Sequence, residues 1–173
     1  MTEKQRSQRM DQLEQAGRDG VSPLSVLQRF RVLIRTAQRH SQWIERQSGV
    51  TGAQLWVLQE LFDLPGVRVG ELARRMALHQ STASNMIDRL ETGGLIRKER
   101  TSADQRVVRL YLTEVGQALL ERAPAPARGI FLEGLSMLEE DELGCLQGVL
   151  DKLLLQIRDL DEGFGMQPLP FTE

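Results

Sequence analysis

The sequence predicts a mainly α-helical fold with one small β-hairpin. Apolar residues recur at helical spacing along most of the 173 residues. Two short helical stretches, 71–76 and 81–92, are separated by only a few residues, which is the spacing of a helix-turn-helix. Directly after them, residues 95–100 and 107–112 carry branched apolar side chains on either side of a polar segment, and this pattern predicts a hairpin.

Composition and cysteine content exclude several classes of protein. With 40% hydrophobic residues, 173 residues are enough to bury the core of one ordinary domain. Cys145 is the single cysteine, so neither an intrachain disulfide framework nor a Cys-rich metal site can form. No apolar window approaches the ~18 residues of a membrane crossing, and the polar N-terminus has no signal-peptide core. We therefore expect a cytoplasmic protein that binds no membrane, no metal and no cofactor.

Charge is distributed unevenly along a chain whose formal net charge is −2. Residues 68–109 hold nine Lys or Arg against five Asp or Glu, whereas residues 110–173 hold four against twelve. The net charge argues weakly against a nucleic-acid partner, but the basic middle segment indicates a surface that faces an anion.

The helices before the hairpin have recognisable ends. The first begins at Ser22, a capping residue followed by proline, and continues to about Gln47. The second begins at a capping box, Thr51-Gly52-Ala53-Gln54, and stops before Leu64-Pro65-Gly66. In the helix over 81–92 the apolar residues lie on one stripe, and Gly93-Gly94 ends it.

The segment after the hairpin is helical and acidic. Thr113 caps a helix that Pro124 and Pro126 must interrupt or bend. A last helix, from about Glu139 to Leu160, carries an apolar stripe wider than one contact within the chain requires. We therefore assign it, the first helix and part of the Thr113 helix to a dimer interface rather than to an intrachain core.

The polar face of the 81–92 helix carries short hydrogen-bonding groups and one guanidinium. Such groups let a helix enter the major groove of DNA, where Gln and Asn pair with adenine, Ser and Thr reach bases or phosphates, and Arg reaches guanine or phosphate. The alternative is that Ser81 is an N-cap and the others are merely solvated. The basic hairpin favours DNA binding, because a helix-turn-helix followed by a two-stranded ribbon is the order of parts in a winged helix. The candidates are Gln80, Ser81, Thr82, Ser84, Asn85 and Arg89.

These parts resemble the multiple antibiotic resistance regulator (MarR) family. The resemblance rests on VGELARRM, STASNMIDRLETGGLI, the Asp104-Gln105-Arg106 element and LTEVGQALL, and it covers roughly residues 22–160. It implies an obligate homodimer of winged-helix subunits that binds pseudo-palindromic operators on double-stranded DNA and is released by a small ligand or by oxidation. It also implies a minor-groove role for Arg106 and a recognition role for Ser81, Thr82, Ser84, Asn85 and Arg89.

The hairpin tip supports a minor-groove contact on physical grounds. Positions two apart in a strand point the same way, so Asp104 can orient the guanidinium of Arg106 as it enters a narrow, negative groove. The alternative is a solvated ion pair that contributes little. Where the family usually has a Pro-containing acidic loop, this chain has Thr101-Ser102-Ala103.

The resemblance also implies an effector site between the dimerisation helices and the winged helix. The first two helices offer arginine, histidine and tryptophan side chains near that junction, which suit a small aromatic or phenolic acid. The alternative is that both tryptophans belong to the core and that the histidine is an interface residue. The candidates are Arg35, Arg39, His40, Trp43 and Trp56.

The sequence thus predicts a ligand-responsive transcriptional repressor and no enzyme, because no nucleophile, paired-carboxylate or phosphate-loop constellation is present. Two alternatives stay open: a winged-helix module that docks an acidic protein, and a regulator released by oxidation of Cys145. Carboxylates around that thiol oppose thiolate formation, so we interpret Cys145 as structural. The expected segments are a flexible arm (1–20), a first dimerisation helix (21–50), the DNA-binding winged helix-turn-helix (51–112), C-terminal dimerisation helices (113–162) and an extended extension (163–173).

Overall fold

The computed structural model describes residues 20–101 and 104–172, without the side chains at 101–106. The chain divides into two compact units, Met1–Thr36 and Ala37–Glu173, and helix α2 (Pro23–Ser48) contributes to both. Ser22 Oγ accepts a hydrogen bond from the N–H of Ser25 at 3.1 Å, which confirms the predicted helix start. The arm predicted over residues 1–20 lies, except for Gly20, outside the described residues.

Helix α3 (Gly52–Asp63) begins and ends as the sequence predicts. Thr51 and Gln54 form a complete capping box, in which each side chain accepts a hydrogen bond from the other residue's backbone N–H. Three leucines of this helix, Leu55, Leu58 and Leu61, are at most 1% exposed and form the centre of the core.

Helices α4 (Val69–Arg75) and α5 (Gln80–Thr92) form the predicted helix-turn-helix. Leu72 of α4 and Ile87 and Leu90 of α5 are buried in the same core as α3. Gly94 has a φ of +70°, so glycine supplies the left-handed conformation that ends α5.

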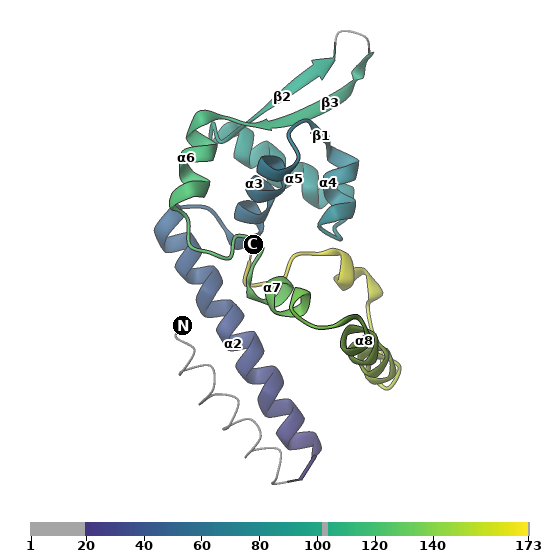
Figure 1. Ribbon diagram of the computed structural model, residues 1–173. Helices are drawn as coiled ribbons and strands as arrows, with labels where there is room; N and C mark the ends of the chain where they lie inside the picture. Colours follow the sequence, from purple (N-terminus) through teal and green to yellow (C-terminus); the bar gives the residue numbers. More distant parts are fainter. Residues whose placement is uncertain (1–19, 102–103, 173) are drawn as a thin grey trace. The chain divides into compact units, whose positions relative to one another are not determined.

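The hairpin belongs to a three-stranded antiparallel sheet in the described part of the chain. Strands β1 (Val67–Arg68), β2 (Ile96–Thr101) and β3 (Asp104–Leu112) follow the order β1-β3-β2, with Ile96 opposite Leu112. The prediction of two strands is therefore incomplete, because two residues are too short to show a strand period. The predicted start of the last strand at 107 is also wrong, since pairing continues to Asp104. Figure 1 shows the hairpin extending from the α3–α5 helices.

The C-terminal segment is helical but more broken than predicted. Helix α6 (Glu114–Arg122) starts at the Thr113 cap, and the prolines separate it from α7 (Ile130–Ser136). Helix α8 (Glu140–Leu154) ends six residues before the predicted Leu160, because Gln156 and Ile157 form tighter i to i−3 hydrogen bonds.

The predicted extended extension is wrong in part. A short 3-10 helix, η1 (Glu162–Met166), follows α8, and the chain after it returns to α3 and α5. Among the described residues, no helix is long and apolar enough to span a membrane.

Candidate nucleic-acid interface

Helix α5 buries one face and exposes the other. Ala83, Met86, Ile87 and Leu90 are all less than one-tenth exposed. The helical period therefore turns the remaining residues outward, as the sequence predicts. Of these, Gln80, Ser81, Asn85 and Arg89 are exposed, and Thr82 and Ser84 are half-buried.

The start of α5 differs from the alternative in which Ser81 is an N-cap. The N-cap residue is His79, whose side chain makes no capping hydrogen bond, and Ser81 lies in the first turn. Ser84 Oγ donates to the backbone oxygen of Gln80 at 2.8 Å, so its own lone pairs can still accept. The short polar side chains of α5 are thus presented outward instead of capping the helix.

Lys98 of β2 joins the hairpin to α5. Its Nζ lies 2.5 Å from Asp88 Oδ1 and 2.8 Å from Glu91 Oε2. Burial acts to lower the pKa of Lys98, but the hydrogen bonds to the two carboxylates outweigh it and raise this pKa above its ordinary value. The positive charge of Lys98 is therefore balanced by two carboxylates of α5, and this pairing orients the hairpin on the helix.

Two arginines of the hairpin also contact the protein itself. The guanidinium of Arg97 lies 4.7 Å from the ring centroid of Tyr111, and it forms an ion pair with Glu99. Arg109 donates to the backbone oxygen of Gly66 at 3.0 Å. The basic character of the hairpin strands thus contributes partly to holding the sheet together, which the sequence pattern does not predict.

The predicted tip pair lies at the start of β3. Asp104 and Arg106 both belong to the strand, so they are two positions apart in extended backbone. Their side chains lie outside the described residues, and the proposed contact between them stays a prediction.

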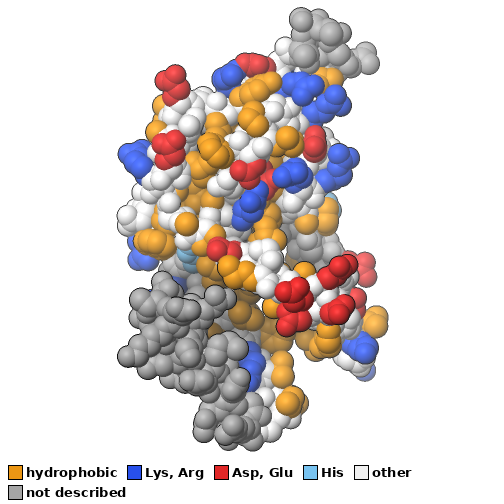
Figure 2. Space-filling model, viewed as in Figure 1, with side chains coloured by type: hydrophobic (Ala, Val, Ile, Leu, Met, Phe, Trp, Pro, Cys, Tyr) orange, Lys and Arg blue, Asp and Glu red, His pale blue; other side chains and the backbone are white. Residues whose placement is uncertain are grey.

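The uneven charge of the sequence produces a basic surface and an acidic surface on the unit formed by Ala37–Glu173. Figure 2 shows Lys and Arg side chains beside the hairpin and a group of acidic side chains over α8. The acidic residues surround the start of that helix, at Glu139, Glu140, Asp141 and Glu142. A polyanion is therefore favoured at the hairpin and disfavoured at α8.

Glu60 is a buried carboxylate that no sequence motif marks. It is 3% exposed and accepts hydrogen bonds from Trp56 at 3.0 Å, Arg75 at 2.7 Å and Arg128 at 2.8 Å. Burial acts to raise the pKa of Glu60, but these donors outweigh it, so the pKa is below its ordinary value. Arg128 also donates to Asp63 at 2.5 Å. The cluster joins α3, α4 and the turn before α7.

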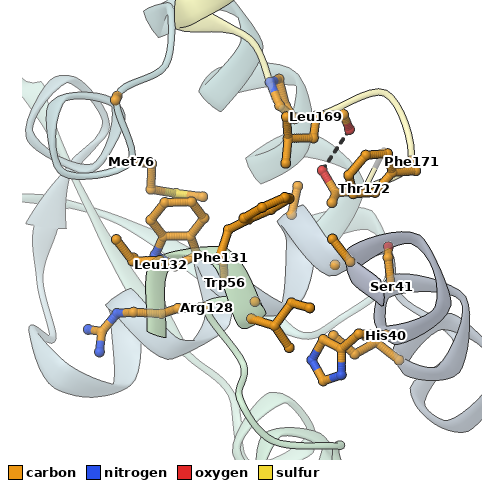
Figure 3. A pocket seen from close by; sticks show the side chains of 18 of the residues that line it. His40, Ser41, Trp56, Met76, Arg128, Phe131, Leu132, Leu169, Phe171 and Thr172 are labelled. Atoms are coloured by element: carbon orange, nitrogen blue, oxygen red, sulfur yellow. Dashed lines mark hydrogen bonds between the residues drawn. The ribbon is translucent and has the colours of Figure 1, made fainter. Parts of the chain in front are cut away.

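A mostly apolar cavity of about 260 Å³ lies between the C-terminal half of α2, the start of α3, α7 and the C-terminal segment. Aromatic rings of Trp56, Phe131 and Phe171 contribute to its walls, and His40 adds a polar group (Figure 3). An apolar cavity of about 150 Å³ is enough for benzene, so this one has room for a single substituted ring.

Of the predicted effector residues, the structure places His40 and Trp56 on the cavity wall. Arg39 and Trp43 are exposed and lie outside that wall, and Arg35 belongs to the other unit. The alternative placed Trp43 in the core of the chain. This is wrong, because the Trp43 side chain is 46% exposed.

Several cavity residues were missed because they lie far from the first two helices in sequence. The cavity walls include Arg128, Phe131 and Phe171, which come from a turn, a short helix and the extension. Arg128 directs its guanidinium toward Glu60 and Asp63. The wall contains aromatic residues, but their sequence positions show no common motif that would have identified them.

Within the described part of the chain, helix α8 is only lightly covered, with Leu143, Gly148 and Leu150 half-buried. None of its residues, all of which are described, is buried. Cys145 is exposed in the single chain as well, and its interpretation as a structural residue stays a prediction. The exposed apolar residues on α8 and directly after it are Leu146, Val149, Leu153, Leu154, Leu155, Ile157 and Leu160.

Residues 50–108 match a profile described as the MarR family. The HTH-type transcriptional repressor MdtR of Bacillus subtilis (strain 168) is 36% identical over 124 residues, which are 72% of this chain and 79% of that protein. A solved MepR-like protein complexed with pseudoligands is 28% identical with a TM-score of 0.55, covering 77% of this chain and 94% of that one. BpsR of Bordetella bronchiseptica, whose DNA binding is regulated by 6-hydroxynicotinic acid, is 28% identical with a TM-score of 0.50. The match covers 76% of this chain and 93% of that one.

These matches agree with the architecture. The profile spans the stretch from the start of α3 into β3, which holds the helix-turn-helix and the hairpin. The relatives extend the likeness to the flanking helices. The chain belongs to the MarR family of winged-helix transcriptional regulators, which bind DNA and are not enzymes.

Proposed function

We propose that this chain is a transcriptional repressor that binds a pseudo-palindromic operator as a homodimer and is released by a small aromatic acid. One observation carries the DNA-binding part: α5 buries its apolar stripe and exposes short hydrogen-bonding side chains beside a basic hairpin. Short polar groups are what a helix needs to approach base edges closely. The name of the B. subtilis relative, a repressor, favours repression over activation.

The proposed contacts are of two kinds: those to base edges and those to the sugar-phosphate backbone of DNA. Gln80 and Asn85 suit adenine edges, and Arg89 suits guanine or phosphate. Arg106, oriented by Asp104, is proposed for the minor groove on the strength of the sequence pattern. Hydroxyl contacts to bases or phosphates are assigned to Ser81, Thr82 and Ser84.

A second copy of the chain is the proposed partner of α8. One winged helix contacts one half-site, whereas a two-fold dimer sets two copies of α5 about 34 Å apart, one turn of DNA. The apolar stripe of α8 is exposed, and an isolated helix of its length is marginal in water. A self-complementary contact between two copies would cover this stripe on both.

The cavity is the proposed effector site. Its aromatic wall suits a one-ring molecule, and BpsR shows that a MarR-like regulator can respond to such an acid. Arg128 is engaged by Glu60 and Asp63, and His40 Nε2 donates to the backbone oxygen of Pro126 at 3.1 Å, so Nδ1 of His40 is the atom that we assign to the acid or hydroxyl. The arginines predicted from the sequence, Arg35 and Arg39, are not assigned to the cavity.

A duplex selected from a random-sequence library tests the DNA contacts. Asn85→Ala should relax preference at particular base pairs, whereas Arg106→Ala should weaken binding across sequences and reduce its salt dependence. Lys152→Ala, on α8, is the matched control and should change neither. Unchanged affinity and preference in both variants, measured by fluorescence anisotropy, would contradict the proposed interface.

Thermal unfolding with 6-hydroxynicotinic acid and benzoic acid as probes tests the cavity. A ligand at about a hundred times its Kd should stabilise the folded protein by about 2.7 kcal/mol. Phe131→Ala should remove this effect, and Phe62→Ala, at an exposed position outside the cavity wall, should retain it. Equal loss in both variants would place binding elsewhere.

A further inference from the structure

The residues that follow η1 return to the winged helix and bind its backbone. We name residues 166–172 the C-terminal strap. The oxygen of Met166 accepts the N–H of His79 at 2.9 Å, and the oxygen of Thr172 accepts the N–H of Ala53 at 2.9 Å. Thr172 Oγ1 donates to the oxygen of Leu169 at 2.8 Å, which turns the end of the strap toward α3 (Figure 3).

The middle of the strap shares a hollow with side chains proposed to read DNA. A hollow of about 180 Å³ has Pro168 on its wall together with Thr82, Asn85 and Arg89 of α5. A helix with its side chains is 10–12 Å across, and the major groove is about 12 Å wide. A chain segment beside this face of α5 would therefore clash with the DNA backbone that forms the wall of the groove.

The backbone N–H groups bound by the strap are of a kind that can also bind the phosphates of DNA. N–H groups at helix N-termini are suited to phosphate oxygens. Ala53 lies in the first turn of α3, and His79 is the N-cap residue of α5. While the strap is seated, the carbonyls of Thr172 and Met166 occupy these two donors.

We propose that the strap is an autoinhibitory segment that competes with DNA for the start of α3 and for the polar face of α5. The proposal rests on the DNA-binding function proposed above. The strap is seated by contacts that can be exchanged, since Met166 is 38% exposed and Leu169 is 45% exposed. A strap that is seated for about nine-tenths of the time lowers the apparent DNA affinity about tenfold.

A reversible crosslink provides the first test. A Cβ built on Gly52 lies 3.5 Å from the Cβ of Thr172, within the usual disulfide range, and 3.1 Å from Ser41 Oγ, which must move slightly. Gly52→Cys with Thr172→Cys, in a Cys145→Ser background, should lose at least about tenfold in affinity on oxidation and recover it on reduction. Gly52→Cys alone in the same background is the matched control and should not respond.

Deletion of residues 166–173 provides the second test. The probes are the selected duplex and a mixed-sequence duplex of about 30 base pairs at low salt, because the strap blocks phosphate as well as base contacts. The truncated protein should bind both about tenfold more tightly than the full chain. If truncation prevents folding, as circular dichroism would show, the crosslinked protein alone tests the autoinhibitory role of the strap.

The outcomes separate the strap from the DNA-binding function. Suppose that the full chain binds DNA, but truncation leaves this binding unchanged or weakens it, or oxidation of the crosslinked protein does not reduce it. Either result would overturn the autoinhibitory role of the strap and retain the DNA-binding function. Failure of the full, truncated and reduced proteins to bind either duplex would overturn both.

Discussion

Glu60 holds three segments of the chain through one carboxylate. Its oxygens accept from Trp56 in the same helix, from Arg75 of α4 and from Arg128 before α7. A buried carboxylate is costly unless its oxygens are hydrogen-bonded, and here three donors satisfy it. Since Trp56 and Arg128 also contribute to the cavity wall, the cluster connects the helix-turn-helix to that cavity.

Glu60→Gln should destabilise the protein by about 1 to 3 kcal/mol, because the amide removes the charge and one acceptor while two arginines remain. Urea unfolding at neutral pH measures the change. Asp63→Asn is the control, since Asp63 binds the same Arg128 but is partly exposed, and its effect should stay below about 1 kcal/mol. Equal losses in the two variants would contradict a special role for the buried carboxylate.

The same residue predicts how stability depends on pH. The pKa of Glu60 is lower in the folded protein than the value of about 4.3 expected when unfolded. Its contribution is therefore fully present above that unfolded value and is lost as pH falls through the folded pKa. Urea midpoints between about pH 6 and 3 should fall less steeply for Glu60→Gln than for the natural chain. Parallel curves would show that another group carries the acid sensitivity.

The outward face of α5 could be predicted because the helical period depends on neighbouring residues alone. Ala83, Met86, Ile87 and Leu90 fix which side is buried, and the polar candidates follow. Glu60 and Arg128 are 68 positions apart, and no local pattern brings them together. The same reason explains why only His40 and Trp56 of the predicted effector residues line the cavity.

At the scale of elements, caps and turns were the most predictable features. The capping box at Thr51 and the Thr113 cap depend on hydrogen bonds across a few residues, and both are present. Strand β1 was missed because its two residues acquire their structure by pairing with β3, more than forty residues away. The early end of α8 was missed because leucine periodicity continues into the turns after it.

Gly116 of α6 marks the closest approach between that helix and the start of the hairpin. A Cβ there would overlap the backbone oxygen of Leu95, and backbone cannot move aside as a side chain can. Gly116→Ala should therefore cost about 3 kcal/mol, measured by thermal or urea unfolding. In Gly134→Ala the new methyl meets open space within α7, and this control should be neutral or stabilising by up to about 1 kcal/mol. Similar effects at both positions would contradict the packing described.

At the scale of the molecule, the proposed dimer predicts the effect of a charge on α8. Leu153→Asp places a carboxylate in the apolar stripe, so sedimentation should show monomers at concentrations where the natural chain is dimeric. Affinity for a two-half-site duplex should fall as well, because each monomer contacts one half-site. Lys152→Asp, on another side of the same helix, should stay dimeric. A dimeric Leu153→Asp protein would place the interface elsewhere.

The two ion pairs of Lys98 link the hairpin to α5. Such a link favours movement of the two proposed DNA-facing elements together when the subunit meets an imperfect site. In the proposed dimer, bending of the duplex or rotation of one subunit against the other would then absorb part of a mismatch. For the dimer proposed above, the spacing of the half-sites would therefore select operators together with the sequence within each, and a ligand that changed this spacing would act on every operator at once.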